Sequence, residues 1–288
     1  MRVLVTGANG YLGKGIVKEL LDRGLDVVAT DFRDEMIDKR AEILCCNLFE
    51  IDNPFALFGE PDVLIHLAWR DGFVHDSDNH IDDMPLHFRF IRKMIDGRIK
   101  DGVVSAGVKR VAVMGSMHEV GFFEGSINEN TPCNPLSKYG ISKNALRRLV
   151  ELECKNKGVL FQWIRGFYIV GNSDDGCSIF SKIVQAEKKG QKEFPFTWGL
   201  NQFDFLDYEV FCEYVAEVVT QEELNGIINI CKGRPEKLAD RVERFIQDNN
   251  YNIVLKYGVF PDRLYDSKAI WGDDTKLKKI QNLMEENK

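Results

Sequence analysis

The sequence lacks any long apolar run and any strongly basic segment. No uninterrupted apolar stretch approaches the roughly 20 residues that a membrane span requires, and the chain begins directly on a strand-like segment without an apolar leader. The formal net charge of −7 and the absence of a basic stripe argue against nucleic acid or anionic membranes as partners. We therefore expect a soluble, cytoplasmic protein.

The seven cysteines show no regular spacing. They are Cys45, Cys46, Cys133, Cys154, Cys177, Cys212 and Cys231. Neither the Cys-x-x-Cys spacing of metal sites nor the arrangement of a disulfide framework is present. We expect most of them to be buried or idle thiols, and we expect no metal site.

The N-terminus carries a short apolar run that leads into three glycines, Gly7, Gly10 and Gly13. Glycines allow backbone torsions and close approaches that side chains would block. The following helix, expected from about Tyr11 to Arg23, presents unpaired N–H groups and a positive dipole end to a pyrophosphate. This order of strand, glycine turn and helix predicts a dinucleotide site.

A second expected strand ends on Asp31. A carboxylate about 20 residues past the glycines accepts hydrogen bonds from the adenosine ribose and repels a 2′-phosphate. This favours NAD over NADP as the cofactor. Arg33 lies close by and could pair with a 2′-phosphate, so NADP stays possible.

The 288 residues, 44% of them hydrophobic, suffice for a large core. Apolar runs alternate with helical patterns, which indicates a parallel sheet with helices on both faces. Strands are expected near 2–6, 26–30, 42–46, 62–68, 109–115 and 159–165, with one long helix or two in 79–107 and helices near 177–190, 207–220 and 235–249. We predict an α/β fold with a Rossmann-type doubly wound sheet over 1–165. A smaller C-terminal α/β substrate lobe over 166–288 follows, with some crossover of the chain between the two parts.

Tyr139 and Lys143 are separated by one helical turn, which puts a phenol and an ammonium on one face of a helix. A phenol alone has a pKa of about 10, and a nearby cation favours the phenolate. The pair therefore has the chemistry of a general acid or base for carbonyl/alcohol redox reactions.

Four separated motifs together carry a family resemblance. They are Thr6–Gly13, Asp62–Ala68, Ser116, and Tyr139 with Lys143. Ser116 stands five residues before Gly121, as a Ser or Thr does in that family just after the fifth strand. The chain resembles the extended short-chain dehydrogenase/reductases, in particular the nucleotide-sugar epimerases, dehydratases and reductases, over nearly its whole length.

The resemblance implies hydride transfer between a nicotinamide and a carbon that bears a hydroxyl or carbonyl. Tyr139 would exchange the proton, Lys143 would lower the pKa of the phenol and bind the nicotinamide ribose, and Ser116 would donate to the substrate oxygen. The implied cofactor-binding residues are Gly7, Asn9, Gly10, Tyr11, Leu12, Gly13, Asp31, Arg33, Asn47, Leu48, Leu67, Ala68, Tyr139 and Lys143. His66 is expected to be a packed strand residue.

One departure from the family pattern concerns dehydration. The sugar dehydratases carry Asp and Glu after the catalytic Thr, whereas Met117 and His118 follow Ser116 here. A thioether cannot transfer protons, so dehydration is disfavoured. His118 and Glu119 are open to two interpretations, as proton donors or substrate contacts, or as a loop pair that only shapes the pocket.

The expected substrate-binding residues are Trp69, Met117, His118, Tyr168 and Arg263. In the family an Arg in a late segment binds the nucleotide diphosphate, and Arg263 matches it, since a guanidinium binds phosphate bidentately. Tyr168 stands where the family often has Asn. A second family Arg is replaced by Phe203, which indicates an altered donor or pose.

We expect an NAD(P)-dependent oxidoreductase acting at C4 of a nucleotide-activated sugar, with an NAD-dependent 4-epimerase as the alternative. A non-catalytic dinucleotide-binding protein would have a broken triad, and all three triad residues are present. Family members often form homodimers through two helices, which would place residues near 83–105 and 139–156 in the interface. An apolar outer face on these helices would support a dimer, and a fully charged face would count against it.

Overall fold

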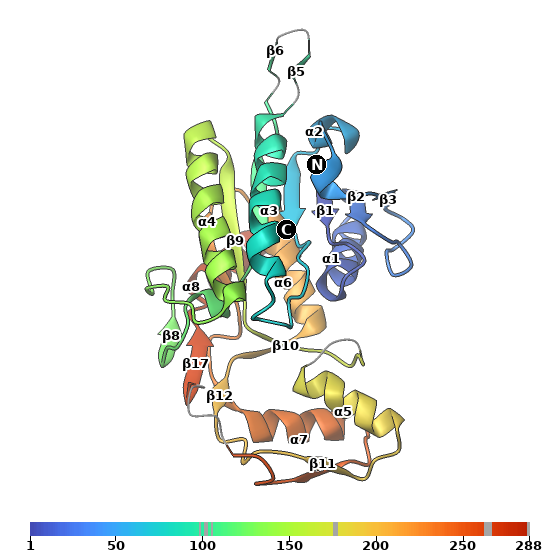
Figure 1. The fold of residues 1–288 in the computed structure, drawn as a ribbon, viewed down its shortest axis with the longest axis vertical. Helices are drawn as coiled ribbons and strands as arrows, with labels where there is room; N and C mark the ends of the chain where they lie inside the picture. The colour runs from blue at the N-terminus through green and yellow to red at the C-terminus, as the bar shows by residue number, and fades with distance from the viewer. Residues whose placement is uncertain (98, 101–102, 105, 175–177, 262–266, 287–288) are drawn as a thin grey trace.

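The computed structural model describes residues 1–97, 99–100, 103–104, 106–174, 178–261 and 267–286 (Figure 1). Its centre is a seven-stranded sheet in the order β14-β9-β7-β4-β1-β2-β3, with every neighbouring pair parallel. The strands are β1 (Arg2–Thr6), β2 (Asp26–Asp31), β3 (Glu42–Cys45), β4 (Val63–His66), β7 (Arg110–Ser116), β9 (Leu160–Gly166) and β14 (Gly226–Ile230). No helix among these residues is long and apolar enough to cross a membrane.

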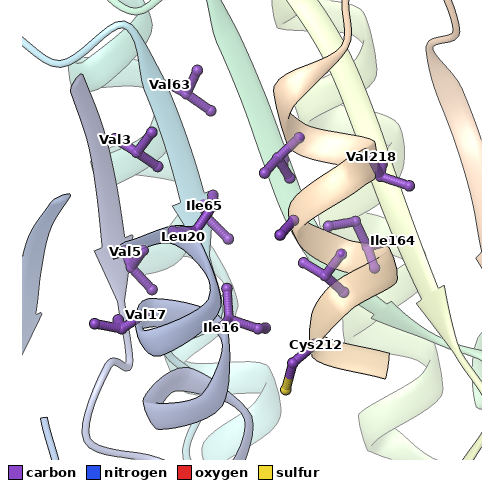
Figure 2. Packing of buried hydrophobic residues seen from close by; sticks show 14 of the residues in the cluster. Val3, Val5, Ile16, Val17, Leu20, Val63, Ile65, Ile164, Cys212 and Val218 are labelled. Carbon is purple, nitrogen blue, oxygen red and sulfur yellow. The ribbon is translucent and has the colours of Figure 1, made fainter. Parts of the chain in front are cut away.

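Helices cover both faces of this sheet. One face packs on α1 (Tyr11–Asp22), α6 (Tyr208–Thr220) and α8 (Thr275–Glu286), and the other on α2 (Pro54–Leu57), α3 (Asn79–Asp96) and α4 (Lys138–Lys157). In β1, Val3 and Val5 belong to the first core and Leu4 to the second, because successive side chains of a strand point to opposite faces. Figure 2 shows the first core, in which Val5 of β1 lies beside Val17 of α1.

The chain beyond residue 166 builds a smaller part with its own core. Its helices α5 (Ile179–Lys188) and α7 (Leu238–Asp248) lie side by side in Figure 1, and the rings of Phe180 and Phe245 meet between them at 5.2 Å. Its short strands are β10 (Tyr168–Val170), β11 (Glu193–Pro195), β12 (Gln202–Phe203), β13 (Phe205–Asp207), β15 (Glu236–Lys237), β16 (Val254–Lys256) and β17 (Ala269–Gly272). β12 and β17 share a four-stranded sheet with β15 and with β8 (Gly125–Ile127).

Most expected elements are confirmed. The six expected strands are β1, β2, β3, β4, β7 and β9, and the three expected late helices are α5, α6 and α7. The described residues of the 79–107 stretch form one helix, α3, which ends where Gly97 adopts a φ of 74°, and β5 (Ile99–Lys100) pairs antiparallel with β6 (Val103–Val104) beyond it. The seventh sheet strand, β14, was not expected.

The chain crosses between the two parts. After residue 166 it returns to the large sheet through α6, β14 and α8. These three elements complete the core on one face of the sheet, so the two parts are not separated by a single cut in the sequence. The predicted boundary at residue 165 between a Rossmann-type domain and a C-terminal lobe therefore stays a prediction.

The turn between β1 and α1 brings backbone segments into direct contact. Gly7 has a φ of 69°, and a Cβ there would lie 2.6 Å from the backbone nitrogen of Ala68, just past β4. A Cβ on Gly13 would lie 2.1 Å from the carbonyl oxygen of Gly7. Only glycine permits these approaches, so the glycine pattern is required by the way the turn packs on the sheet.

A Gly13→Ala substitution should therefore lower the free energy of unfolding by roughly 2 kcal/mol or more, because the added methyl group meets backbone that cannot move aside. Chemical denaturation of the two proteins measures this. Gly72→Ala is the control, since a Cβ on Gly72 meets nothing within 4 Å. Equal losses in the two variants would contradict the packing argument.

Candidate active site

Ser116, Tyr139 and Lys143 come together at the carboxyl end of the sheet. Ser116 ends β7, and the other two lie in the first two turns of α4, whose N-terminus is capped by Ser137. The Ser116 hydroxyl lies close enough to the Tyr139 phenol to favour its ionised form. Lys143 Nζ donates to the carbonyl oxygen of Met114 at 2.8 Å and lies 5.8 Å from the centroid of the Tyr139 ring. The structure thus assembles the expected triad.

The turn after β7 holds Ser116 in place. Residues Met117–Glu119 form a 3-10 turn in which the backbone N–H of His118 donates to Ser116 Oγ at 3.3 Å. In return the backbone N–H of Ser116 donates to Glu119 Oε1 at 2.8 Å. This reciprocal capping box satisfies the backbone groups that the end of the strand leaves free.

Glu119 is buried, and its carboxylate contacts groups of the protein interior. Its side chain has no exposed surface, and its Oε1 also accepts a bond of 2.6 Å from Trp163 Nε1. Its Oε2 lies 3.4 Å from Arg147 Nε and 3.5 Å from Arg165 Nη2. These contacts favour the interpretation in which Glu119 shapes the pocket, because the contacts of its carboxylate among the described residues are with the protein interior.

Burial sets the charge of the two reactive groups. It raises the pKa of Tyr139 to about 12, although the nearby Ser116 hydroxyl acts in the opposite direction. It also lowers the pKa of Lys143 to about 7, since the buried ammonium has no ion-pair partner among the residues described. The lowered phenol pKa that the family resemblance implies is therefore not seen in the structure, because desolvation is the largest influence on the Tyr139 pKa and raises it.

Trp69 provides the main contact of the Lys143 ammonium. Nζ lies 3.9 Å from the centroid of the indole, within the range of a cation–π interaction. The indole N–H donates to His80 Nδ1 at 3.0 Å, and the ring stacks on His87 at 4.7 Å. Trp69 was expected to bind substrate, a role that stays a prediction, and its observed contacts are with Lys143 and these histidines.

All five histidines of the chain gather around Trp69 and Tyr139. They are His66, His75, His80, His87 and His118. His66 is a packed strand residue, as predicted, and its ring bonds Thr6 Oγ1 and His87 Nδ1, both at 2.9 Å. Only His66 and His118 were candidates from the sequence, although all five histidines lie within residues 66–118, which was a signal that they gather.

The expected cofactor residues line the carboxyl ends of β1 to β4. Gly10 caps α1 without a side-chain hydrogen bond, and the first turn of α1 has no acidic residue, so its N–H groups remain free for a phosphate. Asp31 accepts bonds from the backbone N–H groups of Asn9 at 3.0 Å and Phe32 at 2.7 Å. Asn47 follows β3, and Leu67 follows β4. These donors, the free helix end and the carboxylate fit a dinucleotide.

The expected substrate residues are more dispersed. Met117 is buried beside Ser116, and His118 is half-buried against Tyr139. Tyr168 packs on Phe203, with their ring centroids 4.4 Å apart, in the smaller part of the structure. Arg263 lies outside the described residues.

The shifted pKa of Lys143 predicts a pH dependence of stability. Between about pH 7, where the folded protein loses this proton, and the ordinary lysine value of 10.5, the unfolded chain binds one proton more. Wild-type stability relative to Lys143→Met should therefore rise with pH by about 1 kcal/mol per pH unit between roughly pH 7 and pH 9. Urea unfolding across this range measures it, with Lys155→Met as the exposed control on the same helix. A flat difference would contradict the burial argument.

The Glu119 contacts predict a large stability effect. Glu119→Gln keeps the size of the side chain but leaves Arg147 and Arg165 without their buried counter-charge, so we expect a loss of about 3 kcal/mol in the free energy of unfolding. Glu151→Gln is the control, because Glu151 is exposed and pairs with the same Arg147 at 3.4 Å, and exposed pairs contribute about 0.5 kcal/mol. Similar losses in both variants would exclude a special role for the buried pair.

Comparison with known proteins agrees with this geometry. The model of the NAD dependent epimerase/dehydratase family matches residues 3–231. The chain is 38% identical to the dTDP-6-deoxy-L-talose 4-dehydrogenase (NAD(+)) of Aggregatibacter actinomycetemcomitans, over 94% of this chain and 99% of that one. It is 21% identical to the GDP-6-deoxy-D-talose 4-dehydrogenase of the same organism, over 96% and 90%.

Among solved structures, a UDP-glucose 4-epimerase of Thermotoga maritima with UDP-glucose shares the fold, with a TM-score of 0.77 at 19% identity over 97% of this chain and 92% of that one. This chain and the epimerase therefore share a fold. The extent of the family match and the 38% identity together show that the chain belongs to the NAD-dependent epimerase/dehydratase family, a family of enzymes within the extended short-chain dehydrogenases/reductases.

Proposed function

We propose that the protein is an NAD-dependent oxidoreductase acting at C4 of a nucleotide-activated sugar. The observation that carries this proposal is the convergence of Ser116, Tyr139 and Lys143 beside the glycine turn. The 38%-identical relative supports the position of attack and the sugar, since its name specifies a 4-dehydrogenase of dTDP-6-deoxy-L-talose.

The residues of the triad have distinct tasks in this reaction. When bound, NAD supplies the hydride acceptor. Tyr139 takes the proton of the C4 hydroxyl during oxidation and returns it to the ketone oxygen during reduction, while Ser116 hydrogen-bonds the same oxygen. Lys143 stabilises the phenolate and is held for this by Met114 and Trp69. In the reductive direction the phenol pKa of about 12 keeps Tyr139 protonated before it donates, whereas oxidation uses its phenolate form.

Asp31 supports NAD as the cofactor in place of NADP. Its carboxylate is ordered by the backbone N–H groups of Asn9 and Phe32 at the end of β2, where it would meet the adenosine ribose and repel a 2′-phosphate. Arg33 is exposed and forms no ion pair within the described part of the chain. The name of the 38%-identical relative, a 4-dehydrogenase that uses NAD(+), also supports NAD as the cofactor.

Two further assignments belong to this proposal. Arg263 would bind the diphosphate of the sugar donor, and Tyr168, beside Phe203, would lie on the substrate side. A homodimer would form through α3 and α4, whose exposed surface carries Ile81, Ile141, Leu149 and Leu152 among charged side chains. This mixed surface is neither fully apolar nor fully charged, so the dimer stays a prediction.

The test is NADH formation with dTDP-6-deoxy-L-talose and the return reaction with its 4-keto product. Tyr139→Phe should lower kcat by at least about 100-fold, because it removes the proton-transferring oxygen, while NADH binding, followed by fluorescence, stays within about threefold. Tyr214→Phe on α6, which lies in the core on the opposite face of the sheet, is the control and should keep wild-type activity.

Two outcomes would change the assignment. Tightly held NAD with interconversion of sugar epimers and no NADH release would identify a 4-epimerase, since an epimerase must retain its cofactor between two half-reactions. Full activity in Tyr139→Phe would remove the triad from the mechanism.

A further inference from the structure

Two imidazoles lie against the ring of Tyr139, and they come from distant parts of the chain. His118 belongs to the turn after Ser116, and His75 lies between β4 and α3. Their rings meet edge to face at 4.3 Å. His75 stacks on Tyr139 at 5.1 Å with an angle of 9°, and His118 approaches the same ring at 6.2 Å. The pair therefore forms a wall of the site beside the reactive phenol.

The ring nitrogens of this pair are unused, unlike those of the other three histidines. His66 and His87 bond each other, and His80 bonds Trp69 Nε1 and the carbonyl oxygen of Val74. Within the described ranges neither His75 nor His118 makes a hydrogen bond through its ring. Both side chains are only partly exposed. Their four ring nitrogens can therefore form hydrogen bonds with a molecule bound in the site.

The segment that carries His75 is held firmly. The backbone N–H of Tyr139 donates to the carbonyl oxygen of His75 at 2.9 Å. Asp71, at the start of the segment, accepts from Ser77 Oγ at 2.7 Å and from Asn79 Nδ2 at 2.5 Å. The imidazole is thus placed relative to Tyr139 before any substrate arrives, which is what precise recognition of a small group requires.

Both rings are neutral at physiological pH. Burial lowers the pKa of His118 to about 4, with a smaller contribution from the neighbouring His75. Burial also lowers the pKa of His75. A neutral imidazole offers one donor and one acceptor, and a hydroxyl needs one of each. Two neutral imidazoles in contact therefore match an alcohol group far better than they match a phosphate or a carboxylate.

We propose that His75 and His118 together bind a sugar hydroxyl on the carbon next to the reacting one, and so determine which sugars the enzyme accepts. The proposal rests on the proposed function for the identity of the reacting carbon, whose oxygen lies at Tyr139. The neighbouring hydroxyl of a sugar oxidised at C4 is the one at C3. The two histidines select the substrate and take no part in the hydride or proton transfer.

The experiment compares dTDP-6-deoxy-L-talose with the analogue that carries hydrogen in place of the C3 hydroxyl. We measure kcat/KM for oxidation of both sugars, and their dissociation constants in the complex with NADH by calorimetry. Wild type should prefer the hydroxylated sugar about tenfold or more in both quantities, because the analogue leaves the imidazoles without a partner. In His75→Phe and in His118→Phe, which keep an aromatic ring and lose both nitrogens, the preference should fall to within about twofold of unity.

Two further variants separate recognition from structure. His75→Gln retains a donor and an acceptor and should recover part of the preference. Asp76→Asn, an exposed neighbour of His75, should keep the wild-type preference. NADH binding by fluorescence should be the same in all five proteins, which verifies that the cofactor site is intact.

The outcomes distinguish this proposal from the proposed function. An unchanged preference in both Phe variants overturns the role of the histidines while leaving the C4 reaction in place. A wild type that oxidises neither sugar, but whose binding preference collapses in the Phe variants, supports the histidine pair and removes the C4 dehydrogenase. A wild type that binds neither sugar overturns both.

Discussion

One buried carboxylate, that of Glu119, joins the end of β7, the neighbouring strand β9 and helix α4. It accepts the backbone N–H of Ser116 and the indole N–H of Trp163, and it faces Arg147 and Arg165. A charge without exposed surface is stable only when its partners are in place. The position of Ser116 relative to the helix that carries Tyr139 and Lys143 depends on this contact, because it couples the strand end to that helix.

The reactive groups lie in a region that favours neutral species. Burial lowers the pKa of Lys143 and of His118, and raises that of Tyr139. The carboxylate of Glu119 is turned inward to its arginines. Proton transfer therefore relies on one phenol and its hydrogen bonds, and the surrounding aromatic rings and imidazoles shape the space for the sugar. This set of side chains agrees with oxidation at a carbon–oxygen bond. Met117 and His118 stand where the sugar dehydratases carry the Asp and Glu that eliminate water.

Local patterns account for the parts that were predicted well. The six strands, the glycine turn and the N-terminal helix depend on residues within a few positions of one another, so periodicity and spacing suffice to identify them. Strand β14 escaped prediction because it is short and joins the sheet only through β9, some sixty residues earlier in the chain. The prediction that the cofactor residues lie at one edge of the sheet uses a general property of parallel sheets, in which the carboxyl ends of all strands meet at the same edge.

The sequence by itself determined that Tyr139 and Lys143 share a helix face, that glycines form the first turn and that an acidic residue closes the second strand, because each of these follows from spacing along the chain. The tertiary structure decided what distant segments do to one another. It turned Glu119 into the core, placed Trp69 over the amine of Lys143 and brought His75 against Tyr139. These contacts depend on how α3, α4 and the strand ends pack in three dimensions, which no local pattern encodes.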